Sequence, residues 1–94
     1  MVRVLYYAGV REKAGAFETR VGGFSGTLAE LVKRLEERHG ISLTDVSHSQ
    51  PEENDPFSAL IVMVNGRHIA HVGGLETSVS DGDVVSIFPL IGGG

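Results

Sequence analysis

The 94-residue sequence contains no cysteine. A disulfide framework, a thiolate zinc site and a thiol nucleophile are therefore excluded as the basis of its stability or chemistry. The sequence also has no apolar stretch approaching the roughly 20 residues that cross a bilayer. Because Met1 leads directly into strand-like residues, we expect no signal peptide and no membrane contact, and we predict a cytoplasmic protein.

Positive charge is scarce as well. Eight Lys and Arg residues stand against 12 Asp and Glu residues, so the formal net charge is -4. A nucleic-acid binder needs a basic stripe to meet phosphate, which excludes that class here and favours an electropositive protein partner. A chain of this length has room for one hydrophobic core. We therefore predict a single domain over residues 1–94, without a deep active-site cleft of its own.

Two segments near the N-terminus have the composition and period of strands. Residues 2–7 are rich in β-branched and aromatic side chains, and Phe17, Thr19 and Val21 alternate with charged residues. Residues 9–16, which connect these segments, can hold one helical turn. They are too short and too interrupted by glycine to form a second long helix.

A capping box marks the start of the main helix. The Thr27 hydroxyl can accept the backbone N–H of Glu30, and the Glu30 carboxylate can reach back to the backbone N–H of Thr27. Behind this box, apolar residues recur at helical spacing, at Leu28, Leu31, Val32 and Leu35. Gly40 then supplies a stop. The pattern predicts an amphipathic helix whose apolar face belongs to the core.

The second half of the chain has the signals of strands separated by turns. Asn65-Gly66 tolerates positive φ at both positions of a hairpin turn, and Asp81-Gly82-Asp83 supplies a further turn. The expected segments are a surface loop over 41–57, a strand over 59–64, a returning strand over 67–72, an irregular connection over 73–80 and a last strand over 84–88. The order β, β, α, β, β, β predicts an α+β roll, in which one main helix covers a mixed sheet of about five strands.

The last five residues carry the most informative motif. Leu90, Ile91, Gly92, Gly93 and Gly94 follow Pro89 and, fully extended, would reach roughly 17 Å. Glycines without side chains can enter a narrow channel of another protein and adopt the dihedral angles imposed there. We therefore predict a flexible tail over residues 90–94, with an inert, frayed end as the alternative.

The Gly94 carboxylate supplies the chemistry of this tail. It is ionised at neutral pH, so it can attack the α-phosphate of an ATP molecule that a partner holds. The resulting acyl adenylate is open to a sulfur nucleophile, which gives a thiocarboxylate, or to an amine, which gives an isopeptide bond. Neither route requires a catalytic side chain from this protein.

The closing segment from Asp81 to Gly94 resembles that of the MoaD family, the small subunits of molybdopterin synthase. Members show a Gly-Asp turn, an apolar strand, Phe-Pro and a terminal Gly-Gly at this spacing. The resemblance continues in Val64-Asn65-Gly66, in residues 74–77 and in the first loop, Tyr7-Ala8-Gly9-Val10-Arg11-Glu12. It covers nearly the whole chain except residues 42–57. Many members carry a second proline where this chain has Leu90.

The resemblance implies a β-grasp fold, shared with ubiquitin and with the thiamine sulfur carrier ThiS. It implies a sulfur carrier for molybdopterin or tungstopterin synthesis, in which a ubiquitin-activating-like adenylyltransferase of the MoeB type uses ATP to adenylate Gly94. The thiocarboxylate would then enter a molybdopterin synthase large subunit of the MoaE type. The chain would be a carrier or small subunit that binds no cofactor stably. Relatives also act as protein modifiers through isopeptide bonds, or as sulfur donors for tRNA thiolation, thiamine or cysteine synthesis, and these alternatives stay open.

Residues around the tail are the expected partner surface. Leu90 and Ile91 follow Pro89 and are expected to contact a partner, whereas Phe88 is expected to belong partly to the core. Phe88 and Pro89 are also a possible partner surface.

The histidines suggest no metal site. His68 and His71 stand on opposite faces if they share a strand, and no carboxylate or cysteine completes a ligand set. His39 is expected near the helix C-terminus, where it can interact with the helix dipole.

Overall fold

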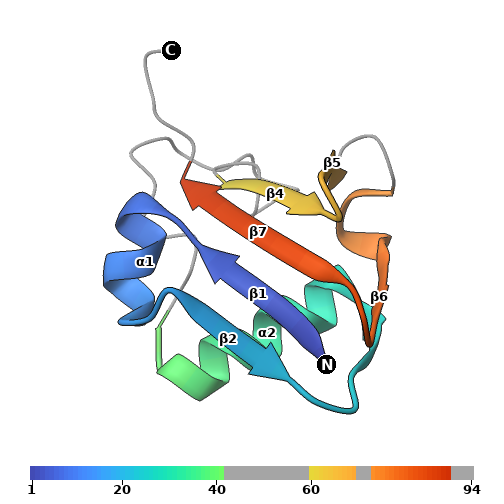
Figure 1. Ribbon diagram of the computed structural model, residues 1–94, viewed down its shortest axis with the longest axis horizontal. Coiled ribbons are helices and arrows are strands. Elements are labelled where there is room, and N and C mark those ends of the chain that lie inside the picture. The colour runs from blue at the N-terminus through green and yellow to red at the C-terminus, as the bar shows by residue number, and fades with distance from the viewer. Residues whose placement is uncertain (42–59, 70–72, 90–94) are drawn as a thin grey trace.

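The fold has two layers. The computed structural model describes residues 1–41, 60–69 and 73–89. A five-stranded sheet in the order β2-β1-β7-β4-β5 forms one layer, and helix α2 lies behind it in the view of Figure 1. The elements are β1 Val2–Tyr6, α1 Ala8–Ala14, β2 Glu18–Val21, β3 Ser25–Thr27, α2 Leu28–His39, β4 Leu60–Val64, β5 Arg67–His68, a 3-10 helix at Gly74–Glu76, β6 Ser78–Ser80 and β7 Val84–Pro89. Within the described ranges, no helix has the length and apolar character needed to cross a membrane.

The first and last strands lie side by side in the middle of the sheet. β1 runs parallel to β7, with Arg3 opposite Val84 and Tyr6 opposite Ile87. β1 pairs with β2, and β7 with β4, in antiparallel fashion. Since parallel strands end at the same edge of a sheet, the ends of β1 and β7 come together there. The predicted α+β roll, with one main helix on a mixed five-stranded sheet, is confirmed.

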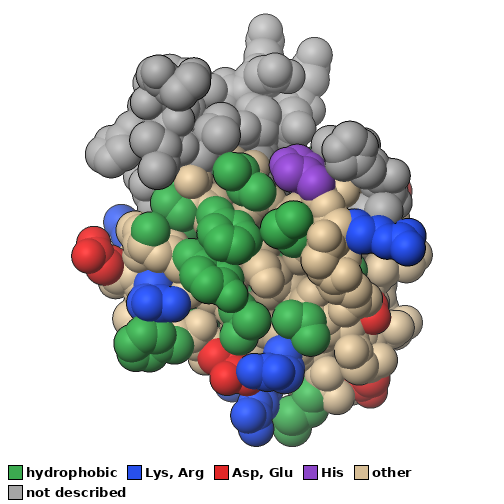
Figure 2. Space-filling model, turned by 45° about the horizontal axis from the view of Figure 1, so that its top comes forward, with side chains coloured by type: hydrophobic (Ala, Val, Ile, Leu, Met, Phe, Trp, Pro, Cys, Tyr) green, Lys and Arg blue, Asp and Glu red, His purple; other side chains and the backbone are tan. Residues whose placement is uncertain are grey.

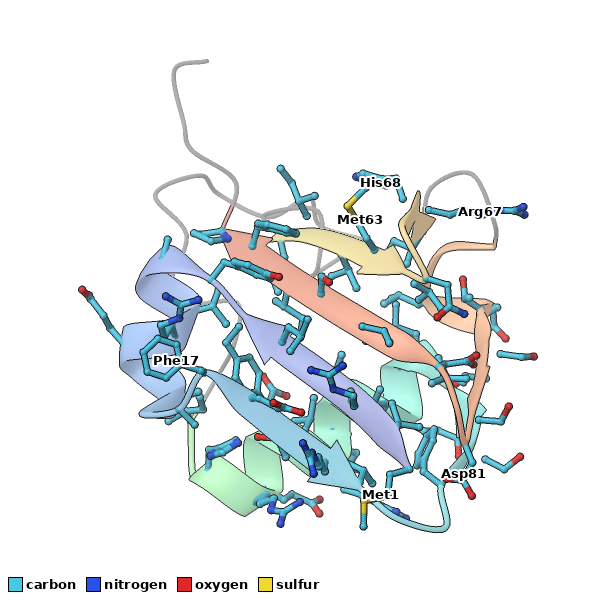
Figure 3. The ribbon with its side chains drawn as sticks, viewed as in Figure 1. Met1, Phe17, Met63, Arg67, His68 and Asp81 are labelled. Carbon is cyan, nitrogen blue, oxygen red and sulfur yellow. The ribbon has the colours of Figure 1, made fainter. Side chains whose placement is uncertain are left out.

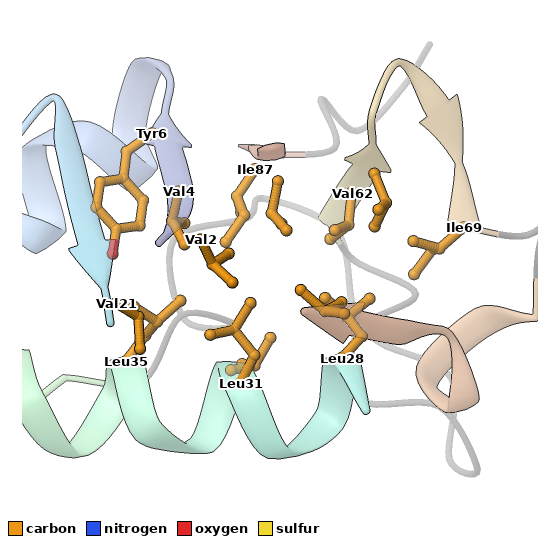
Figure 4. Packing of buried hydrophobic residues seen from close by; sticks show 14 of the residues in the cluster. Val2, Val4, Tyr6, Val21, Leu28, Leu31, Leu35, Val62, Ile69 and Ile87 are labelled. Carbon is orange, nitrogen blue, oxygen red and sulfur yellow. The ribbon is translucent and has the colours of Figure 1, made fainter. Parts of the chain in front are cut away.

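The core lies between α2 and the face of the sheet that α2 covers. Figure 4 shows Leu28, Leu31 and Leu35 of α2 packed beneath the strands. Alternate residues of β1 point down to meet them, so Val2, Val4 and Tyr6 are fully buried. Each such apolar side chain contributes about 1.5 to 3 kcal/mol through burial. The helical pattern in the sequence and the period of two in the strands thus describe the two halves of one core.

The predicted limits of α2 are confirmed. The Thr27 hydroxyl accepts the backbone N–H of Glu30 at 3.2 Å, and the Glu30 carboxylate accepts the backbone N–H of Thr27 at 3.2 Å. At the other end, Gly40 takes a left-handed conformation with φ of 66°. Residues with a side chain rarely adopt this backbone conformation, which explains why a glycine ends the helix.

Two predictions about the connections were wrong, and a third is confirmed where the structure describes it. Helix α1 has seven residues, more than the single turn expected, because Val10 is buried in the core and anchors it. β3 and β6 form a separate two-stranded sheet, although β6 lies in the segment 73–80, for which an irregular connection was predicted. The predicted hairpin at Asn65-Gly66 is confirmed, because β5 pairs with β4 in antiparallel fashion. Of the return predicted over 67–72, β5 covers Arg67–His68, and residues 70–72 lie outside the described ranges. The loop expected over 41–57 also lies outside them, apart from residue 41.

Candidate functional site

The predicted working tail, Leu90 to Gly94, lies outside the described residues, so the predictions about it stay predictions. The structure does describe the point from which the tail leaves. Pro89 is the last residue of β7 and is paired with Leu60 of β4. This end of β7 adjoins the end of β1, because the two strands are parallel. The described neighbours of the tail's base are therefore the ends of β1 and β7 and the start of β4.

The sheet face opposite α2 carries apolar side chains that no described helix covers. Five of them, which we call the open-face cluster, are half-buried: Leu5, Tyr7, Ile61, Met63 and Phe88. The strand register brings them together, since Leu5 and Met63 both lie opposite Ser86, and Ile61 lies opposite Phe88. Figure 2 shows hydrophobic side chains gathered over this face, with charged ones at its margin. Such an apolar patch is typical of a protein-binding surface.

A charged group adjoins the apolar part of this face at the β1–β2 pair, where Glu18 lies opposite Leu5 and Arg20 opposite Arg3. From the start of β1, Arg3 donates to the Glu18 carboxylate at 2.9 Å, and Arg20 of β2 donates to the same carboxylate at 3.0 Å. These two bonds, that from Arg3 first, lower the pKa of Glu18 below its ordinary value. Near the other end of β1, Tyr7 stacks on Phe88, with ring centroids 4.3 Å apart and planes 8° apart. The aromatic end of the face is thus the end from which the tail leaves.

Phe88 lies outside the core, contrary to the expectation that it would be partly core. Val85 and Ile87 of β7 point toward α2, so by the period of two the side chain of Phe88 lies on the open face. Phe88 and Pro89 are both half-buried. Both residues directly precede the predicted tail, so they are positioned where a partner that receives the tail could contact them.

A cation holds an exposed aromatic ring at the side of this face. The Arg11 guanidinium of α1 lies 4.3 Å from the centroid of the Phe17 ring and 5.6 Å from that of Tyr7. The Arg11 Nε also donates to the backbone oxygen of Tyr6 at 3.1 Å. Phe17 is 69% exposed, and Figure 3 shows it beside α1 at the start of β2.

Sequence reasoning missed this arrangement. The alternation of Phe17 with Thr19 and Val21 grouped all three on one face, and only Thr19 and Val21 are buried. β2 begins at Glu18, so Phe17 precedes the strand and its side chain packs on Arg11. The only signal available in the sequence was the presence of Arg11 in a motif that resembles a family's first loop.

His39 takes part in a partly buried polar triad, which the argument from the helix dipole did not predict. Its Nε2 lies 3.2 Å from the Tyr6 hydroxyl and 3.0 Å from the Thr19 hydroxyl, and the Tyr6 hydroxyl donates to that of Thr19 at 3.0 Å. Burial raises the pKa of Tyr6 above its ordinary value. This triad ties the end of α2 to the sheet and is structural.

The other histidine prediction is tested only in part. His68 is half-buried and lies opposite Met63 in the sheet, as Figure 3 shows, whereas His71 is outside the described ranges. In the part of the chain that the structure describes, no three or more His, Cys, Asp or Glu residues are grouped as metal ligands.

Comparison with known proteins gives one family. The model of the ThiS family matches residues 4–94 of this chain. A candidate sulfur carrier protein of Archaeoglobus fulgidus is 37% identical over 68 residues, which are 72% of this chain and 74% of that protein. Small archaeal modifier protein 3 of Haloferax volcanii is 48% identical over 33 residues, and this match spans 35% of this chain and only 36% of that relative.

Solved structures resemble the chain over its whole length. Small archaeal modifier protein 1 of Methanosarcina acetivorans is 28% identical with a TM-score of 0.76, covering 99% of this chain and 95% of that one. A chain of the BexX/CysO complex of Amycolatopsis orientalis is 27% identical with a TM-score of 0.77, covering 100% of both. A candidate molybdopterin converting factor subunit 1 of Pyrococcus furiosus is 26% identical with a TM-score of 0.68, covering 96% of this chain and 97% of that one. The predicted ubiquitin-like β-grasp fold is thereby confirmed.

Proposed function

Since this chain belongs to the ThiS family of ubiquitin-like sulfur carriers and modifiers, we propose that its Gly94 carboxylate is activated with ATP and carries sulfur as a thiocarboxylate. The observation that supports this most is the family match itself, which runs through the terminal glycines to residue 94. Relatives named as sulfur carriers share most of the chain.

The proposed chemistry takes place at one acyl group. A carboxylate oxygen of Gly94 attacks the α-phosphorus of ATP, and pyrophosphate leaves. Sulfur at the oxidation level of hydrosulfide then attacks the carbonyl carbon of the acyl adenylate, AMP leaves, and loss of the sulfur-bound proton gives the thiocarboxylate. Another protein must hold the ATP, because a short glycine tail presents only the reacting carboxylate. This use of ATP also agrees with the proposed cytoplasmic location.

The open-face cluster supports a docking surface for that partner. Tyr7 and Phe88 lie next to Pro89, from which the tail leaves. A partner that covers these two rings gains apolar contact area and at the same time receives the base of the tail. Partly exposed aromatic side chains often dominate the binding energy of an interface.

We further propose that the sulfur goes to a pterin precursor of molybdopterin or tungstopterin. The activating partner would be of the MoeB type, and the sulfur-accepting partner would be a large subunit of the MoaE type. The resemblance of the closing segment to the MoaD family supports this, as does the likeness to the Pyrococcus furiosus chain. Its name refers to a molybdopterin converting factor.

A second candidate function is protein modification. Several of the similar proteins are named small archaeal modifier proteins. In this case a lysine amine of another protein would attack the same acyl adenylate, and an isopeptide bond would form. The activation step is common to both functions, and only the nucleophile differs. The relatives named CysO likewise support a sulfur donor outside the molybdopterin pathway.

Intact mass spectrometry of the protein from its native cells tests the proposal. A sulfur carrier will show a species heavier by the difference between one sulfur and one oxygen atom, located at Gly94. A modifier will instead show conjugates of higher mass. The absence of both species from cells that express the chain would contradict the proposal.

Removal of Gly93 and Gly94 supplies the matching variant. We expect it to abolish ATP-dependent activation, because the acyl group then no longer reaches the nucleotide. The melting temperature should stay close to that of the full chain, since these residues follow the last strand. A large loss of thermal stability would show that the tail has a structural role instead.

A further inference from the structure

We infer that Arg11 and Phe17 form a docking point for an acidic, apolar patch on the activating partner. This inference rests on the proposed function, because it concerns the partner that adenylates Gly94. The docking point is a second contact region beside the open-face cluster, and its charge and ring require an acidic, apolar surface on the partner. It also explains why a large aromatic side chain stays exposed at this position.

Arg11 has hydrogen-bonding capacity that the described residues do not use. Its Nε donates to the Tyr6 backbone oxygen, which fixes the side chain in place. Among residues 1–41, 60–69 and 73–89, no carboxylate lies within salt-bridge distance of its guanidinium, and the neighbouring Glu12 is exposed without pairing to it. The terminal nitrogens of an arginine fixed in this way can receive a carboxylate through two parallel hydrogen bonds.

Phe17 supplies the apolar part of the docking point. At 69% exposure it is one of two large hydrophobic residues that stand exposed in the described part of the chain, the other being Met1. The Arg11 guanidinium over its ring holds it against α1. A ring that is already held in place loses little conformational entropy when a partner covers it. Arginine and aromatic residues together are typical of the few residues that dominate an interface.

The charges on this side of the molecule favour an acidic partner. Arg3 and Arg20 share the single carboxylate of Glu18, so this group carries more positive than negative charge. Arg11 adds a further cation, which no carboxylate of the described ranges pairs with. The net charge of -4 suggested an electropositive partner. On this side of the molecule, however, Arg11 and the group of Arg3, Arg20 and Glu18 together carry a net positive charge. Local charge determines the fit because exposed charges are screened beyond about 8 to 10 Å at physiological salt.

The docking point is continuous with the base of the tail. Arg11 contacts both Phe17 and Tyr7, and Tyr7 stacks on Phe88 directly before Pro89. One partner surface can therefore cover the line from Phe17 to Phe88 while the tail enters its nucleotide site. Binding energy gained along this line would hold Gly94 in place for the reaction.

The test is ATP–pyrophosphate exchange by the purified MoeB-type adenylyltransferase of the same cells, with this chain as the varied substrate. We expect Arg11→Gln and Phe17→Ala each to raise the KM for this chain about tenfold, with kcat little changed. Arg34→Gln is the matched control, because Arg34 also lies over a phenylalanine ring, that of Phe24 at 5.1 Å, but on α2. It should leave KM unchanged. Thermal unfolding of each variant checks that it is folded.

Salt dependence tests the acidic character of the partner. In the wild-type chain KM should rise with ionic strength, and in Arg11→Gln this rise should be smaller, because the ion pair with the partner is lost. A raised KM with an unchanged salt dependence would overturn the proposed carboxylate. Variants with wild-type KM and salt dependence would overturn the whole docking point while the proposed function stands. If the wild-type chain supports no exchange, the proposed function is wrong and this inference falls with it.

Discussion

The two faces of the central sheet are built from alternate residues of the same strands, and they differ in what covers them. In β1, Val2, Val4 and Tyr6 face α2 and are fully buried, whereas Arg3 and Leu5 face the other way. An antiparallel or mixed sheet can turn a polar face to water, so folding alone does not require apolar residues on the open side. The half-buried Leu5 and the Tyr7–Phe88 stack are there nonetheless. The covered face thus serves stability, and we attribute the apolar character of the open face to partner binding.

The largest effect is expected when one leucine is replaced on each side of the sheet. Leu31→Ala removes a fully buried side chain of α2 and should lower the free energy of unfolding by about 2 to 5 kcal/mol. Leu5→Ala removes the same atoms from the open face and should cost about 1 kcal/mol or less, because the site is partly solvated already. Chemical denaturation measures both values. Equal losses would show that both faces contribute alike to stability.

A smaller effect is expected from the polar triad on the covered face. Tyr6→Phe removes the hydroxyl that bonds Thr19 and leaves Thr19 with His39 as its remaining partner at 3.0 Å. We expect a loss of about 1 kcal/mol in the free energy of unfolding. Tyr7→Phe is the control, because Tyr7 lies on the open face and its hydroxyl makes no hydrogen bond to the described residues. A loss in the control as large as that in Tyr6→Phe would remove the distinction.

The smallest effect concerns the exposed ion pairs of Glu18. Its pKa is lowered by the hydrogen bonds from Arg3 and Arg20, so the folded state binds this proton less readily than the unfolded state. The contribution to stability is therefore present above the unfolded pKa, near 4.3, and is lost as the pH falls through the lower folded pKa. Replacing both arginines with glutamine should return the pKa of Glu18 toward its ordinary value in an NMR titration. Arg34→Gln is the control and should leave the pKa of Glu18 unchanged. A Glu18 pKa that stays the same after both Arg3 and Arg20 are replaced would contradict the ion-pair geometry.

Sequence reasoning was most successful where the cause of a structure is local. The capping box at Thr27 and Glu30 joins groups three residues apart, so the limits of α2 could be predicted from hydrogen-bonding capacity alone. The pairing of Ser25–Thr27 with Ser78–Ser80 was missed because each strand has three residues. A segment of that length is too short to show a period, and its partner is remote in the sequence. The buried Val79 shows that this small sheet closes part of the core.

By itself, the sequence determined the helix and its caps, the alternation of the strands, the absence of thiol chemistry and the terminal glycines. Short-range sterics and hydrogen bonding specify these features within a few residues. Only the tertiary structure decided that β1 lies beside β7, so that Tyr7 meets Phe88 next to Pro89, and that Arg11 holds Phe17 at the surface. Strand order and the contacts between such distant residues follow from the burial of the whole core, which no local pattern encodes.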